Sequence, residues 1–274
     1  MEASDARRRS KPAAVTAGLG AGFISGLLGG GGGAIMIPLM TGPLRMTQHV
    51  AHGTSLVVIT GTAALAAALY SFSEPIGASL VLAMAAGAVV GAFAGARGAA
   101  KLPALQLRQV FGIFLIATSL RILLWRPAEP LLVLSGWHET AAASAIGLAG
   151  GLCSGGLGVG GGSIFVPALV LLLGTGQHEA QGISLWVVVA ASLSGAWSYL
   201  RLGAVDVDAA RWIAPPALPG AIAGVFAAAF MGGRTLQVVF AAVLTVIGLQ
   251  MLLTARWRLR QQRLAQPLTV SEPA

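Results

Sequence analysis

The chain has little charge and almost no cysteine. Only 9% of its 274 residues are charged, whereas 56% are hydrophobic. A typical soluble domain carries about 25% charged residues, so this chain has too little polar surface for a soluble protein of its size. The single cysteine, Cys153, excludes an internal disulfide and a metal cluster built from cysteines. The composition therefore predicts a protein that lies in a membrane.

The sequence also lacks the residue sets that catalysis needs. Its four histidines show no metal-ligand spacing, and no Ser/His/Asp set is evident. The acidic residues lie between hydrophobic runs, which argues against a carboxylate proton relay inside the membrane. A phosphate-binding loop is excluded because Ala-Ile follows Gly33 and Ser-Ile follows Gly162, where Lys and Ser or Thr are needed. We therefore expect no enzyme activity, no metal site and no cofactor.

What the sequence does contain is a series of long hydrophobic runs. Most of them reach or exceed the roughly 20 residues that a membrane-crossing helix needs. The charge-free runs are 12–44, 46–73, 75–96, 140–178, 180–200, 212–233 and 235–255. The net charge of +8 comes from Lys and Arg clustered beside these runs, as topology signals are, so we expect no nucleic-acid partner. The predicted fold class is an all-α polytopic membrane protein.

One stretch of sequence occurs twice, 129 residues apart. Residues 18–60 align with residues 147–189 without a gap, and identities in the same register continue to Leu124 and Leu253. An internal duplication with a glycine-broken hydrophobic segment in each copy indicates a transporter whose site lies between two halves. The predicted parts are a basic tail (1–12), a first repeat (13–126), a linker (127–141), a second repeat (142–255) and a second basic tail (256–274), with about four hydrophobic segments in each repeat.

Glycines interrupt the first hydrophobic segment of each repeat. They are five consecutive glycines, 29–33, in one copy, and Gly158, Gly160, Gly161 and Gly162 in the other. Each glycine costs a helix up to about 1 kcal/mol relative to alanine, so we expect a break. Lipid cannot satisfy free backbone groups, so the break must be buried in protein or line a polar cavity. A helix that restarts before Pro38 or Pro167 would aim its positive end at that cavity and favour an anion.

Isolated glycines have a different interpretation. Gly87, Gly91 and Gly95 recur at every fourth position, and small residues at this spacing allow membrane helices to pack closely. We expect Gly91→Ala in this series to be nearly silent, and a valine in either glycine cluster to abolish function.

Two topologies compete for the eight segments. If all eight cross the membrane with the N-terminus inside, 12 Lys and Arg residues lie inside and 5 outside. If segments 13–44 and 142–173 enter and leave on the same side, the split becomes 14 to 3, which fits the positive-inside rule better. This re-entrant arrangement gives each repeat an odd number of crossings. It therefore predicts inverted repeats with both termini in the cytoplasm, while a single tilted helix in each segment remains the alternative.

Polar residues recur at matching places in both copies. A Gln-His pair begins the helix that follows each interrupted segment. These pairs have two interpretations: they gate or bind a solute, or they cap the helix at the membrane interface. Hydroxyl groups near the breaks either touch a ligand or bond back to their own helix. The candidate substrate-binding set is Ser25, Gly29, Gly31, Gly32, Gly33, Pro38, Gln48, His49, Thr54, Ser55, Ser154, Gly158, Gly160, Gly161, Gly162, Ser163, Pro167, Gln177, His178 and Ser184.

These motifs together resemble the sulfite exporter TauE/SafE family. The resemblance lies in the doubled glycine-rich segment that ends in proline, the Gly-x-Ser-Leu element after it, and Lys101-Leu102-Pro103 with Leu107-Arg108 and Phe111. It covers residues 13–255 and implies a bacterial-type inner-membrane transporter of small sulfur-containing or carboxylated anions. The second copy departs from the first, because Met231-Gly232-Gly233 replaces the Lys-Leu-Pro turn and Gln181 replaces His52. These departures leave the substrate open.

The sequence thus predicts an exporter of a small anion such as sulfite, an organosulfonate or a carboxylate, working by alternating access. The membrane potential could supply the drive, with a coupled proton on His49 or His178 as an alternative. A passive anion channel and a non-transporting membrane scaffold are the alternative functions. The expected partners are the solute and the bilayer, and a homo-oligomer is left open.

Overall fold

The computed structural model describes residues 2–30, 32–42, 44–98, 104–124 and 136–265, and every regular element in these ranges is an α-helix. The helices are α1 (Glu2–Leu28), α2 (Gly33–Thr41), α3 (Gln48–Ser73), α4 (Ala78–Gly98), α5 (Ala104–Leu124), α6 (Trp137–Leu157), α7 (Gly162–Leu172), α8 (Gln177–Arg201), α9 (Val207–Ala229) and α10 (Gly233–Ala265). The all-α fold class is confirmed. Gly31, Lys101-Leu102-Pro103 and most of the predicted linker lie outside the described residues.

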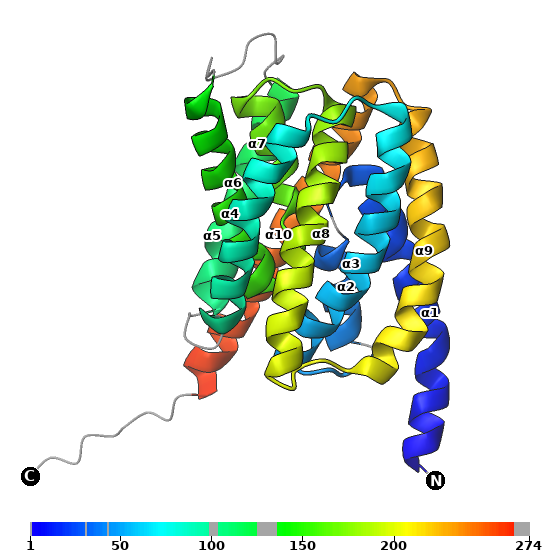
Figure 1. Ribbon diagram of the computed structural model, residues 1–274. Helices are drawn as coiled ribbons and strands as arrows, with labels where there is room; N and C mark the ends of the chain where they lie inside the picture. The colour runs from blue at the N-terminus through cyan, green and yellow to red at the C-terminus, as the bar shows by residue number, and fades with distance from the viewer. Residues whose placement is uncertain (1, 31, 43, 99–103, 125–135, 266–274) are drawn as a thin grey trace, which may run out of the picture.

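The helices stand side by side between two ends of the molecule (Figure 1). α1 rises from the N-terminus at the lower end, and α2 turns back toward that end; α3, α4 and α5 then run up, down and up. α6 descends from the upper end and α7 returns toward it, after which α8, α9 and α10 run down, up and down. Each glycine-interrupted segment therefore begins and ends at the same end of the molecule.

The two helix breaks lie where the glycines predicted them. α1 ends at Leu28 and α2 begins at Gly33, while α6 ends at Leu157 and α7 begins at Gly162. The chain adopts left-handed backbone angles in both breaks, at Gly29, Gly32, Gly158, Gly160 and Gly161. Residues with a Cβ rarely adopt these angles. The glycines are therefore required by the backbone itself.

Small residues allow two pairs of helices to run in close parallel contact. α1 packs along α9, where Gly18 meets Ile213 and Gly26 meets Ala221. α4 packs along α6 in the same way, and a Cβ added at Gly91 would overlap the backbone oxygen of Leu148. The expected close packing is confirmed. The expectation that Gly91→Ala is nearly silent is wrong, because rigid backbone rather than a movable side chain occupies the space.

α5 and α10 pack mainly against each other, at the edge of the molecule. The Thr245 hydroxyl donates to Ser119 Oγ at 2.8 Å across this pair. Arg234 near the start of α10 donates to the carbonyl oxygens of Ile122 and Leu123 at 3.2 and 3.3 Å. These bonds satisfy carbonyl groups at the end of α5 that have no partner within their own helix.

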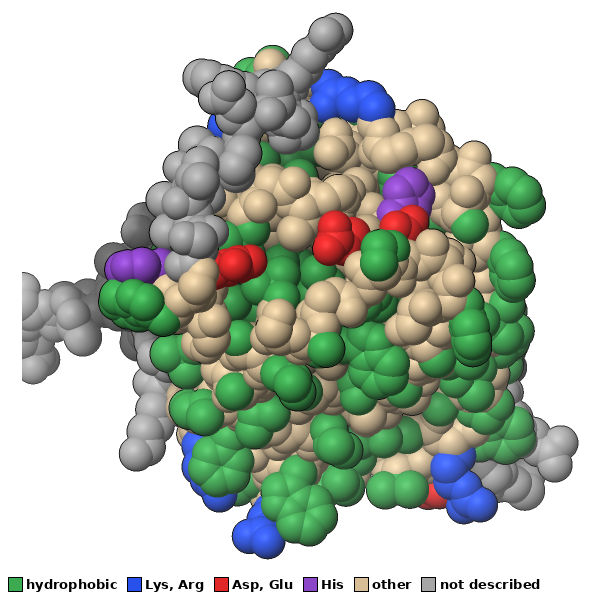
Figure 2. Space-filling view, turned by 45° about the horizontal axis from the view of Figure 1, so that its top comes forward, with side chains coloured by type: hydrophobic (Ala, Val, Ile, Leu, Met, Phe, Trp, Pro, Cys, Tyr) green, Lys and Arg blue, Asp and Glu red, His purple; other side chains and the backbone are tan. Residues whose placement is uncertain are grey.

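Six described helices are long and apolar enough to cross a membrane: α3, α4, α6, α8, α9 and the 233–255 part of α10. Large hydrophobic side chains remain exposed on their outer faces. Figure 2 shows this hydrophobic surface below an upper end that carries acidic side chains. Three acidic residues lie on helix ends that reach this end: Glu74 follows the last residue of α3, and Glu139 and Glu179 lie in the first turns of α6 and α8. The protein is therefore a polytopic membrane protein.

Candidate functional site

The two helix breaks meet each other inside the molecule. A Cβ added at Gly33 would overlap the carbonyl oxygen of Gly158 and lie 2.9 Å from Val159 Cα. In the other copy, a Cβ at Gly162 would overlap the carbonyl oxygen of Gly29 and lie 2.5 Å from Gly30 Cα. Each helix restart thus lies directly against the break of the other copy. The sequence could not show this contact, because it joins segments more than 100 residues apart.

Two serines fix this contact through matching hydrogen bonds. Ser55 Oγ of α3 donates to the carbonyl oxygen of Gly158 at 2.9 Å. Ser184 Oγ of α8, the residue that aligns with Ser55, donates to the carbonyl oxygen of Gly29 at the same distance. Both serines are fully buried. These hydroxyls serve the backbone of the breaks, so the structure gives them a role as supports of the site.

Two tyrosines reach the helix ends that lead into the breaks. Tyr199 OH donates to the Gly155 carbonyl oxygen of α6 at 3.0 Å. Tyr70 OH donates to Gln181 Oε1 at 2.6 Å and lies 3.4 Å from the Gly26 carbonyl oxygen of α1. With the two serine bonds, three hydroxyl donors reach carbonyl groups in the negative C-terminal ends of α1 and α6.

The helix starts beyond the breaks have no side-chain cap. The N-caps of α2 and α7 are Gly32 and Gly161, and neither offers a side-chain capping bond. A helix N-terminus presents unsatisfied N–H groups and a partial positive charge of roughly half an elementary charge. Because the C-terminal ends receive hydroxyl donors and the N-terminal ends have no side-chain cap, the region between the breaks favours a negative group.

Three serine hydroxyls near these helix starts have no hydrogen-bond partner. Ser25 and Ser154 occupy matching places in the last turns of α1 and α6, and Ser163 lies in the first turn of α7. All three are at least nine-tenths buried. An unsatisfied buried hydroxyl costs about 1–3 kcal/mol, so such groups call for an explanation. A polar ligand between the breaks would satisfy them.

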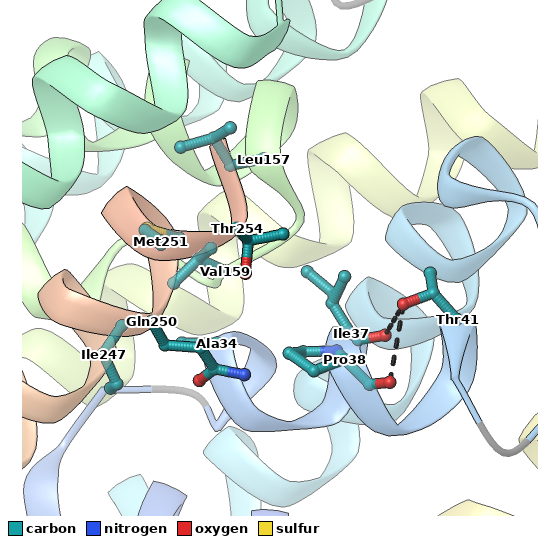
Figure 3. Close-up of a pocket in the computed structure, with 10 residues that line it drawn as sticks. All are labelled: Ala34, Ile37, Pro38, Thr41, Leu157, Val159, Ile247, Gln250, Met251 and Thr254. Atoms are coloured by element: carbon teal, nitrogen blue, oxygen red, sulfur yellow. Dashed lines mark hydrogen bonds between the residues drawn. The ribbon is translucent and has the colours of Figure 1, made fainter. Parts of the chain in front are cut away.

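Two neighbouring cavities lie beside the breaks. The smaller, of about 20 Å³, is lined by Gly30, Gly32, Val159 and Ser163, with apolar side chains of α1 and α10. The larger, of about 80 Å³, lies between α2, the end of α6 and the lower half of α10 (Figure 3). Ala34, Val159 and Ile247 line both. The polar side chains lining the larger cavity are Thr41, Gln250 and Thr254.

Most of the candidate residues gather at this centre, but some do not. Those at or near the breaks are Ser25, Gly29, Gly32, Gly33, Ser55, Ser154, Gly158, Gly160, Gly161, Gly162, Ser163 and Ser184. Pro38 lines the larger cavity, whereas Pro167 is buried inside α7. Thr54 accepts a hydrogen bond from the Asp206 backbone N–H at 2.9 Å near the lower end of the molecule. Gly31 lies outside the described residues.

The two Gln-His pairs start α3 and α8, as expected, but this places them at opposite ends of the molecule. His49 makes an edge contact with the Tyr199 ring, with centroids 5.2 Å apart. His178 Nε2 lies 3.2 Å from the carbonyl oxygen of Ala228. Gln177 is buried and its amide group has no hydrogen-bond partner. These pairs therefore flank the site rather than form it.

Sequence reasoning missed some residues of the site. A Cβ at Gly158 would lie 2.8 Å from His52 Cα, and a Cβ at Gly29 would lie 2.9 Å from Gln181 Cα. His52 and Gln181 occupy aligned positions in the two copies, so the sequence did hold a signal for them, although their side chains differ. The contribution of α10 to the cavities had no signal in the sequence.

Known proteins resemble the chain over most of its length. The family model described as "Sulfite exporter TauE/SafE" matches residues 2–122 and 143–272. The "Probable membrane transporter protein YunE" of Bacillus subtilis (strain 168) is 28% identical over 265 residues, covering 87% of this chain and 96% of that protein. A "Probable membrane transporter protein" of Xylella fastidiosa (strain 9a5c) is 30% identical over 200 residues, covering 70% and 76%. No solved structure matches.

Proposed function

The chain belongs to the sulfite exporter TauE/SafE family, and from this we propose that it carries a small anion across the membrane by alternating access. Sulfite, a small organosulfonate or a small carboxylate would be its solute. The observation that carries this proposal is the contact between the two breaks, where the helix starts at Gly33 and Gly162 have no side-chain cap and serine hydroxyls nearby have no partner. Helix N-termini at the contact between repeats are a recurrent way for transporters to bind anionic groups.

We infer further that the two repeats are inverted and that α1–α2 and α6–α7 are re-entrant hairpins. Support comes from helix packing that is the same in both repeats. The 129-residue spacing aligns α1 with α6 and α4 with α9, and the packing of α1 against α9 corresponds to the packing of α6 against α4. The bond from Ser55 to Gly158 likewise matches the bond from Ser184 to Gly29. Reciprocal contacts of this kind are expected of two copies related by a two-fold axis in the membrane plane.

The distribution of arginines supports a cytoplasmic lower end. Helix ends and loops there carry Arg45, Arg97, Arg201 and Arg211, whereas the upper end carries Arg121 and Arg234 among the described residues. Arg97 stacks on the Phe93 ring at 3.4 Å and Arg201 on the Trp197 ring at 4.8 Å. Arginines beside aromatic rings are typical anchors at the membrane interface. Both termini would then be cytoplasmic, in the inner membrane of a bacterial-type cell.

The cavities support a state that opens toward the cytoplasm. The larger cavity separates α2 from α10 at the lower end, whereas at the upper end the matching helices, α7 and α5, are in contact. Alternating access would bring α2 and α10 together at the lower end and separate α7 from α5 at the upper end. Expelling one negative charge from an inside-negative cell gains about 2.3 kcal/mol per 100 mV, so the membrane potential would favour export.

Counterflow in proteoliposomes tests this proposal. Vesicles that contain the purified chain and are loaded with unlabelled sulfite should take up labelled sulfite faster than unloaded vesicles, because a carrier returns more quickly when loaded. Conduction of sulfite without such stimulation would indicate a passive channel. Uptake no faster than in protein-free vesicles, repeated with methanesulfonate and acetate, would indicate a scaffold and contradict the proposal.

A further inference from the structure

The two cavities of the central site have polar groups but no charged residue among the described residues that line them, and His52, which lies against the Gly158 break, is not part of that lining. Neither cavity is lined by Lys, Arg, His, Asp or Glu. The described charged residues lie instead at helix ends or loops, such as Glu74, Arg97 and Arg234. The attraction for an anion must therefore come from hydroxyl dipoles and from the two helix starts.

The strength of this attraction can be compared with the charge of the ligand. Each helix N-terminus acts as roughly half a positive charge, so the starts of α2 and α7 together supply about one. The opposing C-terminal ends of α1 and α6 are partly satisfied by three hydroxyl donors, Ser55 of α3 and Ser184 and Tyr199 of α8. The unpartnered Ser163 hydroxyl, 5% exposed, lines the smaller cavity between these ends and can donate to the same ligand.

We propose that this site accepts anions that carry one negative charge and discriminates against anions that carry two. The proposal rests on the anion-transport function proposed above and names the charge class of its solute. Moving an ion into a low-dielectric interior costs free energy that grows with the square of its charge, so a second charge multiplies the cost fourfold in the Born description. The partial positive charges at the starts of α2 and α7, together with neutral hydroxyl groups, balance one negative charge on the anion. A second negative charge on the anion would have no compensating positive charge.

The geometry also distinguishes this site from one that binds two charges. Sites for doubly charged phosphate or carboxylate pairs commonly use arginine or lysine, which supply full charges and several donors. Here the available space is small, and the residue of α2 that lines both cavities is Ala34, whose counterpart in α7 is Ser163. At these matching positions, Ala34 presents a methyl group and Ser163 a hydroxyl group to the cavities, so neither copy contributes a charge there.

Competing anions of matched size, each of which keeps a fixed charge at neutral pH, test the proposal. The full-length chain in proteoliposomes is assayed for counterflow of labelled sulfite and of labelled methanesulfonate. Unlabelled methanesulfonate is compared with sulfate as a competitor, and ethanesulfonate with sulfoacetate. We expect the singly charged member of each pair to inhibit at a concentration at least about tenfold lower than its doubly charged partner.

A variant with an added charge gives a second measurement. Ala34→Lys places a cation beside both cavities and should reduce the preference for single charge, whereas Ala34→Gln, of similar length but neutral, should keep it. Equal inhibition by singly and doubly charged competitors in the native chain would overturn the inference and leave the transport function standing. Absence of flux for both labelled anions would instead contradict the transport function.

Discussion

Four buried serines provide a direct test of which hydroxyls bind the solute. Ser25 and Ser154 have no hydrogen-bond partner, whereas Ser55 and Ser184 donate to the backbone of the breaks at 2.9 Å. All four are buried, and each pair occupies matching places in the two repeats. Replacement by alanine removes the same oxygen atom in every case, so the two pairs differ mainly in what the hydroxyl contacts.

The expected magnitudes separate the two pairs. Ser55→Ala and Ser184→Ala leave a buried carbonyl oxygen without its partner, which should lower the free energy of unfolding by about 1–3 kcal/mol each. Ser25→Ala and Ser154→Ala remove a hydroxyl that has no partner, so they should leave stability unchanged or raise it slightly. If these two hydroxyls donate to a bound anion, each loss costs about 1.5–3 kcal/mol of binding, which is roughly a tenfold to hundredfold weaker affinity.

The assay measures both quantities on the same purified variants. Thermal unfolding in detergent without added anion reports stability, and the sulfite concentration that half-saturates counterflow reports affinity. We expect Ser25→Ala and Ser154→Ala to raise the half-saturating concentration with little change in unfolding temperature. If they instead lower the unfolding temperature as much as Ser55→Ala does, with unaltered half-saturation, the hydroxyls only support packing and the reasoning is refuted.

Three further predictions concern packing, topology and selectivity. A Cβ at Gly22 would overlap the backbone of α9, so Gly22→Ala should strongly reduce the amount of folded protein in membranes. A Cβ at Gly20 would have no atom within 4 Å, so Gly20→Ala should leave this amount unchanged, and equal yields of the two variants would contradict the packing argument. The topology is tested with single cysteines in a Cys153→Ala background. Phe230→Cys, at the upper end, should react with an impermeant thiol reagent added outside cells, whereas Leu202→Cys, at the lower end, should not. The reverse labelling pattern would show that the proposed orientation is inverted. Reconstituted protein should not transport nickel, cobalt or sodium ions, because positive helix ends repel cations, and uptake of any of these ions that sulfite does not inhibit would argue against an anion site.

The helix breaks and helix starts were predictable because local physics decides them. Runs of glycine raise the cost of a continuous helix wherever the chain lies, and the breaks occur at Gly29 and Gly158 as expected. The starts of α3 and α8 at Gln48 and Gln177 were also predicted correctly. The inverted arrangement rested on counting charges, and it stays a prediction that the labelling experiment can decide.

The roles of individual polar residues were less predictable, because they depend on contacts between distant segments. The sequence grouped Ser55 with Ser25 as possible ligands, yet only Ser55 reaches a carbonyl oxygen of the other break. The same limitation made the expectation for Gly91 wrong, since the obstructing backbone belongs to α6. A valine at Gly32 would likewise not isolate ligand binding, because the backbone there is left-handed.

The sequence by itself determined that the chain is a helical membrane protein with a duplicated, twice-broken architecture. Hydrophobic length, glycine content and the repeat are properties of consecutive residues, and each acts without knowledge of the rest of the fold. Only the tertiary structure decided that the two breaks touch, that one tyrosine and two serines cap carbonyl groups at the ends of α1 and α6, and that α10 lines the cavities. The physical reason is that these contacts join helices far apart in sequence, and close packing of small residues, rather than any local pattern, brings them together.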